Sequence, residues 1–401
     1  MHIMKRLILM TCCTGVLVLT VAACIGNARV QPSANDFLLT AEAKLPAPTF
    51  TAGEPFNCWT VPAPKTAARD NHSKGKLLLV FSVIREDLLS LYQFDLATQK
   101  YSLLASPIDA LPESPISPDG NYLAYQRRTD PVGFIAYIYS FAESTTRQVP
   151  VLVGESGDWS PDGRCLLIWR DQNIAFAYRL VDGALQKRSW PTESGQLIGE
   201  FSPNGKWRAW SCEKSVCLIG PDGQRIDDSL HLPIATQPRS GYYNTSFIWW
   251  SPDSHMLAIV YPKYDWQYRD GLRLIHLDEN GVSSQDVAAQ GQKKIDDVHW
   301  SPDSNELLIM YWPEESLNIF NLSTGKAIPL SSPNGYSSAV GSSGWSPDGK
   351  QIVFVAQDRH TAYTMNVDGT NIAPIPSLPP DAPGADALAP DFRIDRVLWV
   401  P

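Results

Sequence analysis

The sequence predicts an all-β protein built from repeated four-stranded antiparallel units, and three observations support this prediction. A tight-turn motif recurs six times at intervals of 42 to 50 residues, and repeats of about 40–50 residues are typical of propellers and other arrays. Each copy is followed by a run rich in β-branched and aromatic residues, which favour strands. The C-terminal segment matches the beginning of a unit, whereas the first unit lacks that beginning.

The recurring motif has the chemistry of a tight turn. Proline presets φ at the first central position, aspartate or asparagine suits the second, and glycine relieves the crowded exit. These aspartates are therefore predicted to hold turns rather than to catalyse. An aromatic residue precedes five of the six copies, which are Ser117-Pro118-Asp119-Gly120, Ser160-Pro161-Asp162-Gly163, Ser202-Pro203-Asn204-Gly205, Ser251-Pro252-Asp253-Ser254, Ser301-Pro302-Asp303-Ser304 and Ser346-Pro347-Asp348-Gly349.

Each unit is predicted to contain four strands: one before the motif, one directly after it, a third, and a short fourth after a second turn. A four-stranded antiparallel unit at this period is the blade of a β-propeller. The strands directly after the motif are expected at residues 122–125, 165–169, 207–210, 256–261, 307–311 and 352–355.

The two ends of the chain predict the number of blades. Lys76–Ser82, Leu91–Asp95 and Lys100–Leu104 correspond to the second, third and fourth strands of a blade without its first strand. Arg393–Pro401 matches Lys294–Pro302, which begins a blade. The C-terminal strand is therefore expected to join the N-terminal blade and close a seven-bladed ring, which protects strand edges. The alternatives are six blades, with the N-terminal strands packed outside, and eight blades, with Cys58-Trp59 in a further blade.

These repeats resemble the WD40-like PD40 repeats of TolB-type proteins, whose units carry a Trp-Ser-Pro-Asp-Gly turn. The resemblance covers about residues 75–401 and depends on six copies in phase. It implies a propeller but no particular activity, since such repeats serve many functions. It also implies that the loops between second and third strands share one face with the connections between blades, and that the motif turns lie on the opposite face.

The N-terminus has the pattern of a signal peptide. Two basic residues precede an uncharged, mostly apolar stretch from Leu7 to Val21, 15 residues long, which is shorter than the about 20 residues of a membrane span. The segment ends in Val21-Ala22-Ala23-Cys24, which resembles a bacterial lipobox. The resemblance implies that Cys24 is the lipid-modified first residue of a membrane-anchored protein. An uncleaved anchor and a soluble secreted protein are the alternatives.

The predicted organisation is a signal peptide over residues 1–23, a tether over 24–74 and a propeller over 75–401. The tether is rich in Pro, Ala and Thr, a composition that favours extended chain, and Cys58 and Trp59 within it are candidates for docking on the propeller. The net charge is −9, and because residues 1–23 contribute two positive charges, the rest of the chain carries −11. Such an acidic surface repels phosphate backbones, so nucleic acid is not expected as a partner.

Four cysteines follow Cys24, and two of them form a candidate disulfide. Cys212 and Cys217 flank the predicted tip of a hairpin, and disulfides persist outside the cytoplasm. Two free thiols on opposite faces are the alternative. No Cys/His spacing resembles a metal site, and no phosphate-binding glycine loop is present, so neither a metal nor a cofactor is expected.

The candidate binding patch consists of aromatic residues from two segments predicted to emerge on the loop face. Aromatic side chains with a polar group are favoured at recognition surfaces, whereas the alternative is that they cover hydrophobic blade edges. Trp312, Arg127 and Arg128 project from equivalent loops and are weaker candidates. The patch residues are Tyr242, Tyr243, Tyr264, Trp266 and Tyr268.

Catalysis has less support in the sequence. His299 follows Asp296 and Asp297, and His360 follows Asp358 and Arg359, but a solvated or hydrogen-bonded histidine explains both. The sequence therefore predicts a lipid-anchored propeller of the bacterial envelope, facing the periplasm or the cell exterior, that binds a protein or glycan without catalysis. The alternatives are a propeller enzyme, such as a polysaccharide lyase or glycosidase with a channel site, and a purely structural envelope component.

Overall fold

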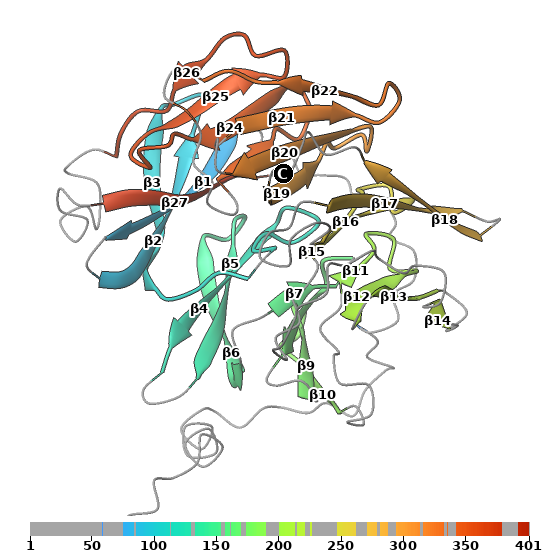
Figure 1. The fold of residues 1–401 in the computed structure, drawn as a ribbon. Coiled ribbons are helices and arrows are strands. Elements are labelled where there is room, and N and C mark those ends of the chain that lie inside the picture. Colours follow the sequence, from blue (N-terminus) through green and yellow to red (C-terminus); the bar gives the residue numbers. More distant parts are fainter. Residues whose placement is uncertain are drawn as a thin grey trace, which may run out of the picture.

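The computed structural model of the chain is all-β (Figure 1). It describes Cys58 and most of residues 75–401. The described residues contain no helix, and their strands form seven antiparallel sheets, six of four strands and one of three. The all-β class and the four-stranded antiparallel sheets are therefore confirmed. Outside the described part are residues 1–57, 59–74, 84–85, 113, 130–132, 154–156, 161, 170–173, 190–199, 213–214, 221–224, 227–246, 262–270, 279–280, 288–293, 313–315, 333–334, 336–341, 379–391 and 401.

The sheets are numbered here in chain order. The first has the strand order β27-β1-β2-β3 and the others follow the chain. The first sheet contains β27 (Phe392–Trp399), β1 (Lys76–Val83), β2 (Glu86–Asp95) and β3 (Lys100–Ile108). The second sheet contains β4 (Tyr122–Arg128), β5 (Phe134–Ser140) and β6 (Thr145–Val153). The third sheet contains β7 (Gly157–Trp159), β8 (Cys165–Trp169), β9 (Ile174–Arg179) and β10 (Leu185–Ser189).

The fourth sheet contains β11 (Glu200–Phe201), β12 (Arg208–Cys212), β13 (Ser215–Ile219) and β14 (Arg225–Ile226), and the fifth contains β15 (Phe247–Trp250), β16 (Met256–Tyr261), β17 (Gly271–Asp278) and β18 (Gly281–Val287). The sixth sheet contains β19 (Lys294–Trp300), β20 (Glu306–Trp312), β21 (Ser316–Asn321) and β22 (Lys326–Pro329). The seventh sheet contains β23 (Ser343–Trp345), β24 (Gln351–Val355), β25 (Ala362–Asn366) and β26 (Ala373–Pro374).

The C-terminal strand lies in the N-terminal sheet. β27 pairs antiparallel with β1, with Leu77 opposite Trp399 and Leu79 opposite Val397, and in Figure 1 the red strand β27 lies beside the blue strands. Val397 and Trp399 are buried in one cluster with Leu79 and with Val353 of the seventh sheet. The predicted pairing of the two chain ends is therefore observed, while a closed ring of seven blades stays a prediction.

The second sheet departs from the predicted pattern because it has only three strands. In place of an inner strand the chain makes two isolated bridges, from Ala110 to Gln126 and from Ile116 to Leu123. Pro112 and Pro115 lie in this segment, and proline lacks the N–H that a ladder requires. The segment therefore keeps the position of an inner strand without a continuous ladder.

The motif residues form the predicted turns. In all six copies the motif serine hydroxyl donates to the Asp or Asn side chain two residues on, at 2.5–2.8 Å. The same hydroxyl accepts the backbone N–H of the residue five positions on, at 2.8–3.0 Å. The Ser301 hydroxyl and the following backbone N–H groups hold the pKa of Asp303 below its usual value. The carboxylates of the motif aspartates therefore stabilise the turns.

Two copies carry serine where the others carry glycine. Ser254 and Ser304 adopt φ values of 66° and 63°, in the left-handed region that favours glycine. Both side chains are buried, and each hydroxyl accepts a backbone N–H from the previous motif: Asn204 N donates to Ser254 Oγ at 2.9 Å and Asp253 N to Ser304 Oγ at 3.1 Å. A serine at this position therefore introduces backbone strain into the turn, but its hydroxyl forms a hydrogen bond between neighbouring sheets.

This arrangement predicts an unusual order of two substitutions. Ser304→Ala removes the acceptor of the Asp253 N–H but keeps a Cβ in the left-handed region, so it should cost about 1–3 kcal/mol of unfolding free energy. Ser304→Gly loses the same hydrogen bond but is relieved of about 1–2 kcal/mol of backbone strain, so it should cost less. Urea denaturation measures both. A larger loss for Gly than for Ala would contradict the role assigned to the hydroxyl.

Tryptophans at the ends of inner strands join neighbouring sheets. The indole N–H groups of Trp159, Trp300 and Trp345 donate to the carbonyls of Pro115, Trp249 and His299, at 3.0–3.3 Å. Each acceptor lies two residues before the motif serine of the preceding unit. The corresponding Trp399 Nε1 in β27 is buried and has no hydrogen-bond partner within the described part of the chain. The seam between the seventh and first sheets therefore relies on other contacts.

Candidate functional site

Most of the predicted site residues lie outside the described part of the chain. Cys24 belongs to residues 1–57, and the five patch residues belong to two other segments that are not described: Tyr242 and Tyr243 to residues 227–246, and Tyr264, Trp266 and Tyr268 to residues 262–270. Lipidation at Cys24 and the aromatic patch therefore stay predictions. Trp312 ends β20, and its side chain is also outside the described part.

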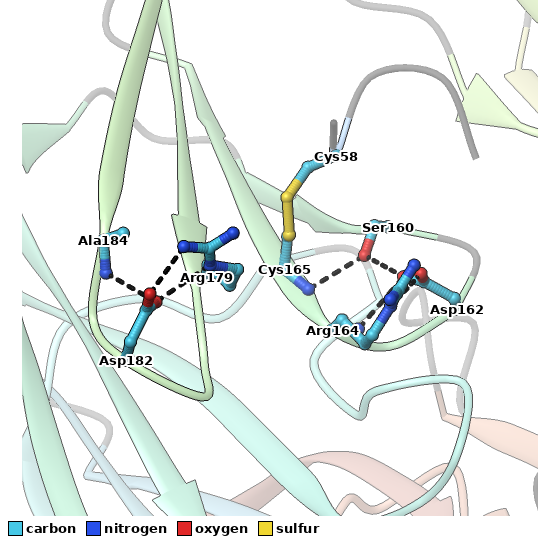
Figure 2. The surroundings of a disulfide bond; sticks show 8 residues. All are labelled: Cys58, Ser160, Asp162, Arg164, Cys165, Arg179, Asp182 and Ala184. Carbon is cyan, nitrogen blue, oxygen red and sulfur yellow. Dashed lines mark hydrogen bonds and ion pairs between the residues drawn. A yellow bond between two sulfur atoms is a disulfide. The ribbon is translucent and has the colours of Figure 1, made fainter. Parts of the chain in front are cut away.

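A disulfide connects the N-terminal segment to the third sheet (Figure 2). Cys58 and Cys165 are bonded, with their Cα atoms 6.0 Å apart, and both are buried. The backbone N–H of Cys165 donates to the hydroxyl of the motif residue Ser160, so the bond lies at the motif-turn end of β8. The predicted tether is thus fixed to the propeller at Cys58 rather than free up to residue 74.

The disulfide predicted from the sequence pairs Cys212 with Cys217, and the structure describes the side chain of only one of them. β12 and β13 form the predicted hairpin, with Cys212 opposite Ser215 and Trp210 opposite Cys217. Cys217 is buried and disulfide-bonded. Because the side chain of Cys212 lies outside the described part, the Cys212–Cys217 pairing stays a prediction.

Charged residues gather near the start of inner strand β19. Asp297 Oδ2 lies 3.0 Å from His299 Nε2, and Lys294 Nζ lies 2.5 Å from Asp296 Oδ1. The register of β19 against β20 shifts between Ile295 and Asp297, so Asp296 is at a β-bulge, a feature that redirects side chains. A carboxylate beside an imidazole can orient the imidazole for proton transfer. The contact between Asp297 and His299 is therefore the observation that best supports a catalytic role.

The same device recurs at the start of β27. The register of β27 against β1 shifts at Asp395, which corresponds to Asp296 in the matching segments. Asp395 Oδ1 accepts hydrogen bonds from Arg359 Nη2 at 2.5 Å and pairs with Arg393 Nε at 3.1 Å. Arg359 lies in the loop between β24 and β25, and its carbonyl accepts the N–H of Ile394. These contacts join the seventh sheet to the first.

His360 is not part of a catalytic arrangement among the described residues. Its side chain is exposed, and its ring meets Phe392 edge to face with centroids 6.0 Å apart. Its backbone N–H donates to Asp358 Oδ1. The histidine therefore belongs to the turn that carries Arg359.

The two weaker candidates at the end of β4 are held by aromatic rings. The rings of Tyr125 and Tyr137 are stacked with centroids 5.4 Å apart, and the guanidinium carbon of Arg127 lies 5.7 and 5.2 Å from their centroids. Arg128 lies 5.7 Å from the ring of Phe134. Burial raises the pKa of Tyr125, so the ring beneath Arg127 is neutral. Cation–π contact holds both arginines at the loop end of the second sheet.

A pocket of about 270 Å³ lies at the motif turns of the sixth and seventh sheets. Its acidic lining consists of Asp303, Glu306 and Asp348. Asp303 and Asp348 accept the hydroxyls of their motif serines, and Glu306 accepts the side-chain amide of Asn321. These carboxylates hold turns and strands together, so the pocket is not assigned a ligand.

The described ranges contain neither a metal-binding group nor a membrane-spanning helix. No group of three or more His, Cys, Asp or Glu side chains in these ranges is placed to hold a metal ion. The same ranges contain no helix long and apolar enough to cross a bilayer.

Comparisons with known proteins agree on the fold and leave the activity open. No family model matches the chain, and no curated protein matches its sequence. A proposed 6-phosphogluconolactonase of Bacteroides uniformis has a TM-score of 0.50 at 14% identity, over 81% of this chain and 99% of its own. Oligogalacturonate lyase in complex with manganese gives 0.48 at 14%, over 75% and 85%. TolB of Acinetobacter baumannii gives 0.42 at 14%, over 82% and 83%. The chain therefore has a β-propeller fold, and at these identities the likeness extends to the fold alone.

Proposed function

We propose that this chain is a lipid-anchored propeller of the bacterial envelope that binds a protein or glycan partner without catalysis. The observation that carries the proposal is the Cys58–Cys165 disulfide. Disulfides form and persist outside the cytoplasm, and the described residues contain a third disulfide-bonded cysteine, Cys217. An extracytoplasmic protein with a signal-like N-terminus and Cys24 in a lipobox-like context suits an anchored location.

The position of the disulfide also supports a binding role. It attaches the N-terminal segment at the motif-turn end of β8, where the Ser160 turn lies. The opposite ends of the sheets carry cations and aromatic rings that the turns do not use, among them Arg127 and Arg393. Rigid sheets hold such groups in fixed positions, which lowers the entropy lost on binding. Anchoring would further raise the effective concentration of a partner at the envelope.

An enzyme is the second candidate, and the pair of Asp297 and His299 favours it. Asp297 is buried, and the His299 side chain is 26% exposed, so a proton-transfer role is sterically possible. A lyase or glycosidase would need further groups around a substrate. Loss of turnover on an acidic or neutral polysaccharide in a His299→Ala variant, with the fold retained, would establish this alternative.

The proposed function is tested by capture of partners from native envelopes after crosslinking. Trp266→Ala combined with Tyr243→Ala should weaken capture of the wild-type partner at least about tenfold, as expected for truncated hot-spot aromatics, with little change in thermal stability. Ile328→Ala, an exposed residue of β22, is the matched control. Unchanged capture by the double variant would overturn the patch. In parallel, a fatty-acid analogue should label the wild type but not Cys24→Ala, and equal labelling would overturn the anchor.

A further inference from the structure

The seam between the seventh and first sheets lacks the indole hydrogen bond that joins other neighbouring units. At three other seams a tryptophan N–H donates to a backbone carbonyl of the preceding unit. Each acceptor lies two residues before a motif serine, so the equivalent acceptor for Trp399 is the carbonyl of Gly344. Trp399 Nε1 is nevertheless buried without a hydrogen-bond partner in the described ranges. The motif-turn end of this seam therefore has one polar contact fewer than its counterparts.

A chain of polar contacts crosses the same seam at its opposite end, where β27 begins. Arg359, in the loop between β24 and β25, donates through Nη2 to Asp395 Oδ1, and its carbonyl accepts the backbone N–H of Ile394. Asp395 Oδ1 also lies 3.1 Å from Arg393 Nε. The same Nε donates to Ser82 Oγ at 3.2 Å. These contacts connect the seventh sheet to β27 and β27 to β1.

Arg359 is held in a costly conformation. Its φ of 60° lies in the left-handed region, which is unfavourable for a residue that has a Cβ. Its Nε is buried and has no hydrogen-bond partner within the described residues, which adds a desolvation cost. Such costs persist where the surrounding structure offsets them. The charge-assisted hydrogen bond to Asp395 provides this compensation, because the two side chains are only 28% and 21% exposed and are thus partly shielded from water.

The seam between the fifth and sixth sheets provides an internal comparison. Its inner strand β19 has the same acidic bulge, because Asp296 stands where Asp395 stands in β27. This seam also has hydrogen bonds at its motif-turn end: Trp300 donates to the carbonyl of Trp249, and the Ser304 hydroxyl accepts a backbone N–H from the preceding motif. The seventh–first seam lacks the indole bond and therefore depends more strongly on the contacts at its loop end.

We propose that Arg359, Asp395 and Arg393 form an ionic latch, and that weakening this latch opens the seam between the seventh and first sheets while the other sheets stay folded. The latch is a conformational device that goes beyond the proposed binding function and does not depend on it. Because it is ionic, its strength falls as the salt concentration rises. The amide of Ile394 reports on it directly, since this N–H is bonded to the carbonyl of Arg359 across the seam.

The test is hydrogen–deuterium exchange of the full chain, which detects local opening, resolved at the amide of Ile394. The amide of Ile295, at the equivalent position of β19, is the internal reference. Arg359→Gln should raise the exchange rate of Ile394 about tenfold or more, as expected for loss of a charge-assisted hydrogen bond, and that of Ile295 less than about twofold. Arg179→Gln is the matched control and should leave Ile394 unchanged, because Arg179 pairs with Asp182 within a single turn of the third sheet.

Salt separates an ionic latch from a packing contact. An increase in NaCl from about 0.1 M to about 1 M shortens the screening length from about 10 Å to about 3 Å, so it should raise the exchange of Ile394 about threefold in the wild type and leave that of Arg359→Gln unchanged. If Arg359→Gln does not fold, Asp395→Asn removes the opposite charge and provides the same comparison. The latch would be overturned by an Ile394 exchange rate that responds to neither substitution, by equal acceleration at Ile295, or by a wild type in which Ile394 is insensitive to salt.

Discussion

A chain that lacks residues 393–401 is expected to lose its cooperative folded state. The deletion removes the inner strand of the first sheet together with four buried side chains: Ile394, Val397, Trp399 and Val400. Truncation of a single buried aliphatic or aromatic side chain costs about 1–5 kcal/mol, and a domain has only about 5–15 kcal/mol in total. The deletion also exposes the edge of β1, which invites aggregation. Far-UV circular dichroism with urea denaturation measures the loss.

Point variants separate this effect from the loss of chain length. Val397→Asp buries a charge at a position with 0% exposure, so it should unfold the protein at neutral pH or lower its unfolding free energy by more than about 3 kcal/mol. Ile328→Asp in the outer strand β22 is the control, because that side chain is 57% exposed. An unaltered melting curve for the deletion would show that the first sheet does not need β27.

The fold was largely predictable because its signals are local and repeated. The strand after the motif was expected at 165–169 and at 256–261, and the structure has β8 and β16 over those residues. Even the long-range pairing of β27 with β1 followed from a local match, since Arg393–Pro401 repeats the pattern of Lys294–Pro302. The missing ladder before the first motif was not predicted, although Pro112 and Pro115 were its signal.

The site was harder to predict because its contacts join residues far apart in the chain. The pairing of Cys58 with Cys165 spans 107 residues, and spacing alone does not select among possible partners. Arg359 and Asp395 meet only because the seventh sheet lies beside the first. Arg127 was noted as a loop residue, but the stacked tyrosines beneath it depend on the register of β4 and β5. Local patterns thus predict the turns and strands, while the chemistry of the site depends on the assembly of the sheets.

Removal of the Cys58–Cys165 bond is expected to cost several kcal/mol in unfolding free energy. The bond closes a loop with a sequence separation of 107 residues, which includes strands β1 to β7. In the chain-entropy treatment, a loop of about 100 residues is worth about 4.7 kcal/mol through the unfolded state. Cys58→Ser and Cys165→Ser should each lower stability by about 2–5 kcal/mol under oxidising conditions, measured by urea denaturation of the full chain.

Because the two substitutions remove the same bond, their effects should not add. The double variant is expected to be about as unstable as either single variant, whereas independent sites would sum. Cys165 is buried in β8 and Cys58 lies outside the sheets, so a loss seen only in Cys165→Ser would indicate a packing effect and contradict a disulfide contribution. Equal losses in both single variants would instead show that the N-terminal segment stabilises the propeller through its covalent attachment at the third sheet. The same attachment would then make the motif-turn end the point from which any membrane anchor acts on the fold.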